Sequence, residues 1–267
     1  MHYHVVARTF GESTPFSNPN QAYWVWHRLK EAFPQTLAAT LMPNHLHLVL
    51  KSDSPYETRI SLAHILGRFT HVFQKPTPFW QPVPQPSEIV SQEKLRRDIR
   101  YVLLNPCRAK LCKDPLEWKW STYRGSLGAS AHPWVPQKNL ISVMNGSLPQ
   151  IHRYITSDPS VSVSGTSLPQ PAPTHSSAQR SLKEIAWAAF AATEELPDLQ
   201  NLQIKKSNAR RYFVRLACQQ GWTDVGMLTR FMQIHRATTW ALIQREKGKS
   251  CAPATLCLGD PRLLNLH

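Results

Sequence analysis

The sequence predicts an α+β fold, in which a sheet packs against helices, followed by a smaller all-α domain. Segments whose apolar residues alternate are interleaved with segments whose apolar residues recur at helical spacing. The order lacks the regular βαβ rhythm of a parallel sheet, and no glycine-rich phosphate loop is present. A Ser- and Pro-rich stretch then precedes a region that contains only helical patterns.

The first region contains two strand patterns and three helix patterns. Residues 1–9 alternate as a strand, and residues 37–50 predict a second strand with its lead-in. Helices are expected at residues 18–33, 60–73 and 91–104, where apolar residues recur every three or four positions. Pro106 is expected to end the third helix, because proline cannot continue a helix.

The domain boundaries follow from a change in composition. Residues 157–178 are dominated by Ser, Pro, Thr and Ala, cannot bury a core, and therefore predict a linker. The linker separates a domain at residues 1–156 from a helical domain at 179–249, which is followed by a tail at 250–267. The second domain has helix patterns at residues 182–190, 209–217, 223–232 and 236–244. Gly221 provides a stop before the third of them, and Thr223 its N-cap.

The charge of the chain points to a polyanionic partner. Lys and Arg number 31 against 17 Asp and Glu, for a formal net charge of +14. Residues 1–160 carry 18 basic and 10 acidic side chains, and residues 161–267 carry 13 and 7, so both regions could contact phosphate. A surplus of this size favours nucleic acid, although basic surfaces also serve solubility.

The cysteines and the hydropathy of the sequence indicate in which cellular compartment the protein is expected. The five cysteines are odd in number and form no C-x-x-C pair, which argues against a disulfide framework and a zinc knuckle. No apolar run approaches the length of a membrane span, and the N-terminal residues lack a signal-peptide core. These features predict a cytoplasmic, nucleoid-associated protein with no membrane partner.

Two histidines share one face of the predicted strand at residues 37–50. Side chains alternate along a strand, so His45 and His47 point the same way, about 7 Å apart. Two imidazoles at this spacing can hold one divalent ion, and added oxygen ligands suit Mn²⁺ or Mg²⁺ at a phosphate. A half-buried edge strand with two polar residues is the alternative. His2 and His4 repeat the spacing, but fraying at the N-terminus argues against a metal site there.

The third helix presents a tyrosine on a polar, basic face. At about 100° per residue, Tyr101 falls nearly opposite the apolar side chains, and Asn105 follows one turn later. A tyrosine hydroxyl beside cations and a metal-polarised phosphate can attack a phosphodiester, and Asn105 offers an oxygen as a third ligand. An ordinary exposed tyrosine, with Asn105 merely preceding a proline, is the alternative. The apolar face consists of Leu95, Ile99, Val102 and Leu103.

Four motifs, in this order, carry a resemblance to a known family. They are MPNHLHLV at residues 42–49, FWQ at 79–81, YVLLNPCRA at 101–109 and WKWSTYR at 118–124. Together they resemble the single-tyrosine HUH transposases, in particular the branch called REP-associated tyrosine transposases. The resemblance covers roughly residues 1–135.

The resemblance implies a fold and a set of functional residues. The expected fold is a ferredoxin-like HUH domain, an antiparallel sheet with helices packed on one face. The expected activity is single-stranded DNA cleavage and strand transfer at hairpins of the repetitive extragenic palindrome type, through a 5′-phosphotyrosine. By position, His45 and His47 match the ligands of Mg²⁺ or Mn²⁺, Asn105 a further ligand and Tyr101 the nucleophile. The family works as monomers or dimers, so a homodimer is one expected state.

Two groups of residues are expected to contact DNA. A phosphate track borders the site, and the two last helices have the dimensions of a helix-turn-helix, similar to the DNA-binding extensions of some family members. The track consists of Arg96, Arg97, Arg100, Arg108 and Lys110. In the second group Val225, Leu228, Ala237, Ala241 and Leu242 pack the helices together, and Arg236, Thr238, Thr239, Gln244 and Arg245 face DNA.

Three functions compete at this stage. The first is a transposase that acts on single-stranded and hairpin DNA. The second is a domesticated nuclease that processes hairpins by the same chemistry. The third is a catalytically silent, sequence-specific DNA-binding regulator, against which the intact set of two histidines, tyrosine and asparagine argues.

Overall fold

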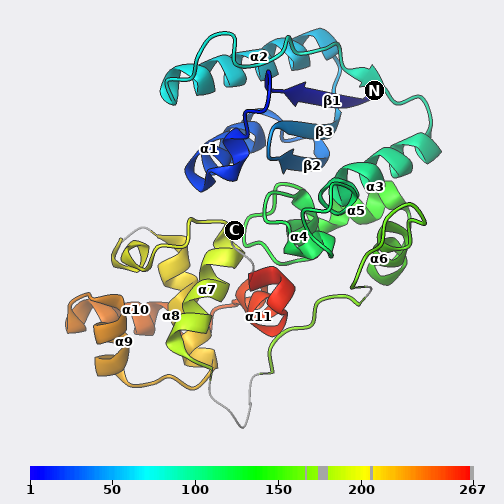
Figure 1. The fold of residues 1–267 in the computed structure, drawn as a ribbon. Helices are drawn as coiled ribbons and strands as arrows, with labels where there is room; N and C mark the ends of the chain where they lie inside the picture. The colour runs from blue at the N-terminus through cyan, green and yellow to red at the C-terminus, as the bar shows by residue number, and fades with distance from the viewer. Residues whose placement is uncertain (166, 174–179, 205–206, 265–267) are drawn as a thin grey trace. The chain divides into compact units, whose positions relative to one another are not determined.

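The chain forms two compact units in a computed structural model that describes residues 1–165, 167–173, 180–204 and 207–264 (Figure 1). The first unit contains Met1–Ser126 and Trp134–Ser167, and the second contains Leu127–Pro133 and Leu168–His267. Within the predicted linker, helical domain and tail, residues 166, 174–179, 205–206 and 265–267 lie outside the described residues.

A four-stranded antiparallel sheet forms the centre of the first unit, which confirms the mixed α+β class. Its order is β2-β3-β1-β4, so β3 and β1 are the inner strands. The register sets His47 opposite Val6 and His45 opposite Arg8. The strands are β1 (His2–Arg8), β2 (Thr36–Met42), β3 (His45–Lys51) and β4 (Ser87–Glu88).

The helices of the first unit begin at side-chain caps that the sequence supplies. Asn18 caps α1, and Ser91 caps α3. Ser54 accepts a hydrogen bond from the Glu57 amide, so α2 begins at Pro55, five residues earlier than predicted. The helices are α1 (Pro19–Ala32), α2 (Pro55–Val72), α3 (Gln92–Arg108), α4 (Thr122–Ser126), α5 (Gln137–Met144) and α6 (Leu148–Thr156), with 3-10 turns at Pro15–Ser17 (η1) and Pro115–Glu117 (η2).

The strand predicted at residues 37–50 is two strands. β2 ends at Met42 and β3 begins at His45, and the two pair antiparallel. Pro43 has no amide hydrogen to donate to a ladder, so the chain turns there. The predicted lead-in is therefore a strand of its own.

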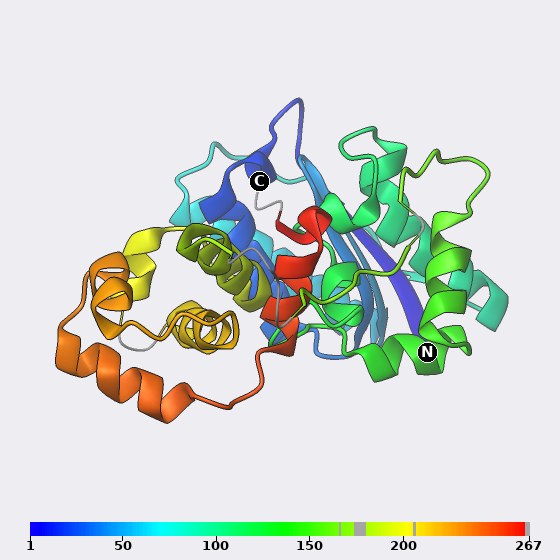
Figure 2. The same cartoon turned by 90° about the horizontal axis from the view of Figure 1, so that it is seen from below.

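Helices cover both faces of the sheet, so the prediction of helices on one face is wrong (Figures 1 and 2). The face that carries Leu46 and Leu48 packs against α1 and α2 in the main hydrophobic core. The opposite face carries Thr40 and His47, and α3 lies there, since the Thr40 hydroxyl donates to the Val102 carbonyl at 2.9 Å. The alternation of the strands is what separates these two layers.

Pro106 does not end α3, which continues to Arg108. Proline lacks the amide hydrogen that the carbonyl of Val102, four residues earlier, would accept. The buried hydroxyl of Thr40 donates to that carbonyl instead, so the broken helical bond leaves no unpaired acceptor. The sheet thus stabilises the helix at the position where the sequence alone predicts its end.

The second unit is all-helical in its described residues. Its predicted helices form, each within a few residues of the expected bounds, but Asp224 rather than Thr223 caps α9, by accepting from the amides of Gly226 and Met227. None of the described helices of the chain is both long and apolar enough to span a membrane. The helices are α7 (Leu182–Thr193), α8 (Asn208–Gln219), α9 (Val225–Met232), α10 (Arg236–Glu246) and α11 (Ala252–Gly259), with 3-10 turns at Leu199–Gln203 (η3) and Pro261–Leu264 (η4).

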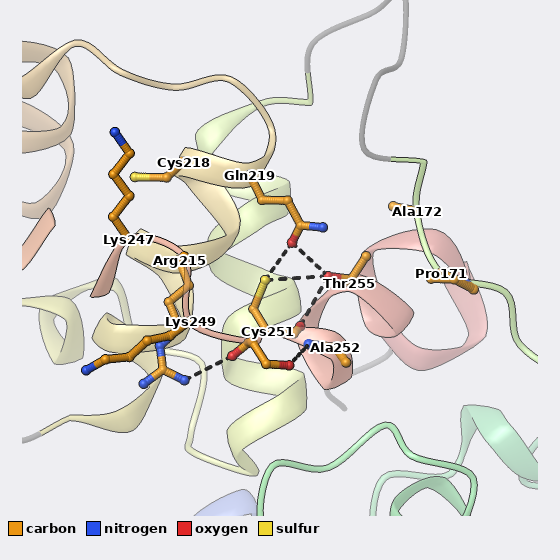
Figure 3. A pocket seen from close by; sticks show the side chains of 12 residues that line it. Pro171, Ala172, Arg215, Cys218, Gln219, Lys247, Lys249, Cys251, Ala252 and Thr255 are labelled. Atoms are coloured by element: carbon orange, nitrogen blue, oxygen red, sulfur yellow. Dashed lines mark hydrogen bonds between the residues drawn. The ribbon is translucent and has the colours of Figure 1, made fainter. Parts of the chain in front are cut away.

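Part of the predicted tail packs into the second unit as α11. At its start the Cys251 thiol donates to the Gln219 side-chain oxygen at 2.6 Å, and the Thr255 hydroxyl donates to the same oxygen (Figure 3). Gly259 lies so close to the backbone of residues 170–172 that any Cβ there would clash with it. Residues 170–172 of the predicted linker are therefore packed against α11.

Candidate active site

His45 and His47 lie on one face of β3, as the alternation predicts. Their ring centroids are 4.9 Å apart. β3 is an inner strand, flanked by β2 and β1, and His47 is only 5% exposed. The pair therefore does not belong to an edge strand, and the alternative interpretation of the spacing does not hold.

Hydrogen bonds at Nδ1 orient both imidazole rings. The Asn44 side-chain oxygen lies 2.7 Å from His45 Nδ1, and His4 Nε2 lies 3.1 Å from His47 Nδ1. An amide oxygen only accepts, so His45 carries its proton on Nδ1 and has a lone pair at Nε2. The buried Nε2 of His47 has no hydrogen-bond partner among the described residues. Such outer contacts are the usual way to fix the ring of a metal-binding histidine.

His4 joins this site, against the expectation that fraying keeps it away. β1 pairs with β3 on one side and β4 on the other, which holds the N-terminal residues in the sheet. The His4 ring lies 5.3 Å from the ring of His47 between centroids. The sequence feature that could have predicted the position of His4 is the alternation of residues 1–9, because it sets His4 and Arg8 on one face of the strand.

Tyr101 projects from α3 toward the histidines. Its ring centroid is 5.7 Å from that of His47 and 6.2 Å from that of His4, with the rings edge to face. The residue is 40% exposed, so a ligand can reach it from solvent. The structure therefore brings a phenol from the helix and imidazoles from the sheet together.

Asn105 is buried rather than displayed on an outer polar face. It is 8% exposed, and its Nδ2 has no hydrogen-bond partner among the described residues. The stripe of α3 that carries Tyr101 and Asn105 faces the sheet at this end of the helix, because Thr40 holds the neighbouring Val102 against β2. An amide with unused hydrogen-bonding capacity thus lies one turn from the tyrosine.

The residues of the predicted phosphate track differ in their surroundings. The Arg108 guanidinium lies 5.3 Å from the centre of the Tyr101 ring. Arg97 pairs with Glu93, Arg96 lines a hollow beside Tyr154, and Lys110 is exposed past the end of α3.

Asp158 holds two arginines of the track in place. It lies 2.6 Å from Arg108 and 3.3 Å from Arg100, and its side chain is 6% exposed. Burial raises the pKa of the Asp158 carboxyl, but hydrogen bonds from Ser160, followed by the two guanidiniums, hold this pKa below its usual range. Asp158, which lies in the predicted linker, therefore positions the Arg108 guanidinium beside Tyr101.

Burial lowers the pKa values of the two strand histidines. The pKa of His47 falls to about 3 and that of His45 to about 4, first through burial and then through nearby positive groups such as Arg8. Both rings are therefore neutral near pH 7 and keep a lone pair for a cation.

This electrostatic setting predicts that any Mn²⁺ binding at the two histidines is nearly independent of pH between 5.5 and 7.5. Protons compete with a metal only below the pKa of its ligand, and both pKa values lie below this window. Calorimetric titration with Mn²⁺ at several pH values checks this, with a change of less than about threefold expected. A fall of about tenfold or more from pH 6.5 to 5.5 would show that the histidines titrate near their ordinary pKa instead.

For a metal ion, the described side chains at this site would supply only part of a coordination sphere. Over the described residues, no group of three or more His, Cys, Asp and Glu side chains is arranged to hold an ion. The donor set of two imidazoles and one amide leaves positions open for phosphate oxygens and water, as Mg²⁺ and Mn²⁺ prefer.

The predicted DNA-facing residues of the second unit differ in exposure. Arg236, Thr238, Gln244 and Arg245 are exposed on α10. Thr239 is not: it is buried against α9, where the Thr229 hydroxyl donates to it at 2.9 Å.

The packing face of α10 also differs from the prediction. Ala237 and Ala241 are exposed, because Leu242 and Ile243 form the apolar face of α10 instead. Trp240 stands on the outer face, 57% exposed.

Comparisons with known proteins give one weak structural match. No family model matches the sequence, and no curated protein matches it. Among solved structures, a REP-associated tyrosine transposase bound to a REP hairpin has a TM-score of 0.41 and 17% sequence identity, over 50% of this chain and 82% of that chain. A likeness at this level does not assign the chain to a family.

Proposed function

We propose that the first unit is a metal-dependent nuclease and strand transferase for single-stranded DNA, with Tyr101 as its nucleophile. The observation that carries this proposal is the Tyr101 ring 5.7 Å from that of His47, which itself neighbours His45. The β-α-β-β-α-β order of β1 to β4 supports a ferredoxin-like HUH domain, in line with the four motifs. The chain is then a transposase of the single-tyrosine class.

Three side chains would hold a divalent ion, Mg²⁺ or Mn²⁺. They are His45 and His47, each through Nε2, and Asn105 through its side-chain oxygen. The unpartnered buried Nε2 of His47 supports this assignment, since buried polar groups normally have partners. When bound, the ion polarises the scissile phosphate and offsets its developing charge.

Tyr101 carries out the covalent step in this proposal. Its oxygen, having lost its proton, attacks the scissile phosphorus, and a phosphorus–oxygen bond to tyrosine forms as the bond to the 3′ oxygen breaks. The leaving oxygen takes up a proton and becomes a free 3′-hydroxyl, while the 5′ end stays on the protein. Arg108 stabilises the added negative charge from beside the ring. Attack by the 3′-hydroxyl of another strand reverses the step, and that exchange is the strand transfer of transposition.

The substrate class follows from charge and from access to the site. Tyr101 attacks one phosphodiester, and single-stranded DNA beside a hairpin stem lets the backbone reach this exposed residue. Residues 161–267 carry 13 basic and 7 acidic side chains, which supports a role for the second unit, with α9 and α10 as a helix-turn-helix, in holding the duplex stem. A domesticated nuclease uses the same residues and differs only in its genomic target.

The proposal is tested by capture of the covalent intermediate. Full-length protein is incubated with a pool of end-labelled single-stranded hairpin oligonucleotides in Mn²⁺ or Mg²⁺, then run on a denaturing gel. A labelled band at the mass of protein plus DNA is expected with metal and absent with a chelator. A silent DNA-binding regulator gives no such band under either condition, and an equal band in chelator removes the metal from the mechanism.

A further inference from the structure

The second unit contains a groove that the proposed active site does not use. It lies between α8, η3 and α10 and has a volume of about 800 Å³. Its walls carry two arginines and several amide, hydroxyl and imidazole groups, and no Asp or Glu is among the lining residues. They are Gln203, Arg210, Gln233, Ile234, His235, Ala237, Thr238, Ala241, Leu242 and Arg245.

Arg210 in this groove is a buried cation that has no anionic partner among the described residues. It is 3% exposed, its Nε has no hydrogen-bond partner among the described residues, and its Nη1 donates only to the neutral carbonyl of Gln203 at 3.3 Å. No carboxylate of the described residues lies within ion-pair distance of it. By contrast, Arg215, one turn further along α8, pairs with Glu246 at 2.7 Å.

The charged group that influences the pKa of Arg210 has the same sign. Arg245 also lines the groove and, after burial, is the second influence that lowers the pKa of Arg210. A buried cation that faces only another cation costs stability, unlike one that is paired. The groove therefore offers a site that an anion would complete.

Another wall of the groove contains the start of α10, where the positive end of the helix dipole favours anions. The Ala237 amide there donates to His235 Nδ1 at 3.3 Å. Ala237 and Ala241, expected in the core, face the groove instead, and their small side chains leave its floor open. Gln203 and Gln233, joined by a hydrogen bond of 2.9 Å, form one end.

We propose that this groove binds a backbone phosphate of DNA, with Arg210 as its anchor and Arg245 as a second contact. The inference rests on the proposed function in taking DNA as the substrate, and it names the group that attaches the second unit to the DNA stem. A volume of about 800 Å³ and an open rim suit a polymer backbone, which a lone phosphate would not fill. The guanidinium fork of Arg210 matches two phosphate oxygens at once.

The test is duplex binding by full-length Arg210→Met, measured by fluorescence anisotropy with a labelled 20-base-pair duplex at several salt concentrations. We expect affinity to fall about tenfold and the slope of log affinity against log salt to decrease by about one, as for one lost phosphate contact. Lys183→Met, which removes an exposed charge of α7 outside the groove, is the matched control. Its affinity and slope are expected to stay within twofold of wild type.

The stability of the Arg210→Met variant shows whether Arg210 serves DNA binding or the fold. Removing an unpaired buried cation is expected to leave the urea unfolding midpoint unchanged or raised. Arg210→Gln, which can still donate to the Gln203 carbonyl, replaces the Met variant if that variant unfolds, with the same binding result expected. Unchanged affinity and slope overturn the proposal, as does a loss of affinity without a change in slope.

Two further measurements assign the ligand. Inorganic phosphate at 10 mM is expected to change the melting temperature of wild type by less than 1 °C. A larger shift that is absent in Arg210→Met, together with unchanged duplex affinity of that variant, would indicate a site for small anions. That result would overturn the DNA assignment. At saturating hairpin DNA, Arg210→Met is expected to form the Tyr101 adduct at the wild-type level. Loss of duplex affinity with the adduct retained supports the groove separately from the chemistry of the first unit.

Discussion

Tyr101→Phe is expected to lose covalent attachment to hairpin DNA by more than about 1,000-fold, the order of effect when an enzyme loses its nucleophile. The substitution removes one oxygen and keeps the ring that lies beside His47 and His4. Packing and DNA affinity should therefore change little. The rate of adduct formation is measured on a denaturing gel, and DNA affinity by anisotropy.

The control for this variant is Tyr56→Phe. Tyr56 is an exposed tyrosine on α2 in the same unit, 59% accessible, and is expected to form adduct at the wild-type rate. A Tyr101→Phe protein that still cleaves at the wild-type rate contradicts the assignment of the nucleophile. A variant that loses DNA affinity as strongly as cleavage points to a binding role for Tyr101 instead.

His47→Ala is expected to weaken Mn²⁺ binding at least tenfold and to lower adduct formation more than about 100-fold. His47 is the most buried of the three site histidines, and its Nε2 is the unpartnered atom at the centre of the cluster. Excess Mn²⁺ should restore activity poorly, because one of the three proposed ligands is lost. Calorimetric titration and the gel assay provide the two readouts.

The matched control is His64→Ala, which removes an exposed imidazole from α2. We expect its Mn²⁺ affinity and its adduct formation to equal those of wild type. The thermal unfolding temperature of both variants accompanies the assays, so that a loss of fold is distinguished from a loss of ligand. Full activity of His47→Ala in the presence of a chelator would remove the histidines from the mechanism.

Local periodicity predicted the parts of the site that depend on one element at a time. The alternation of β3 sets His45 and His47 on one face, and the helical wheel sets Tyr101 apart from Leu95 and Ile99. Both rules need only the geometry of a single strand or helix. The sequence pattern could therefore name the candidate nucleophile and ligands before the elements were placed in space.

The contributions that sequence reasoning missed come from pairing between elements. His4 enters the site because β1 lies between β3 and β4, and no local pattern tells that an N-terminal strand is an inner one. Thr40 carries α3 past Pro106 through a bond between sheet and helix that spans 62 positions of sequence. Asn44 is a residue type that is common in turns, so the sequence indicates only a turn there. Its contact with His45 Nδ1 shows that it also orients the His45 ring.

α10 was misassigned for a different reason. Its small residues, Ala237 and Ala241, fit either a tight helix contact or an open surface, and its buried face contains the polar Thr239 and Glu246. A wheel that counts apolar residues therefore selects the wrong side. The actual inner face is set by Thr239 against Thr229 and by Glu246 among three basic side chains, Arg215, Arg245 and Lys249.

The most direct measurement is mass spectrometry of the protease-digested protein–DNA adduct after nuclease trimming. The chain has seven tyrosines, so the position of the attached nucleotide discriminates among them. The account predicts a 5′-phosphonucleotide on the peptide that contains Tyr101, formed only when Mn²⁺ or Mg²⁺ is present. A nucleotide on any other residue, or metal-independent attachment, would contradict it.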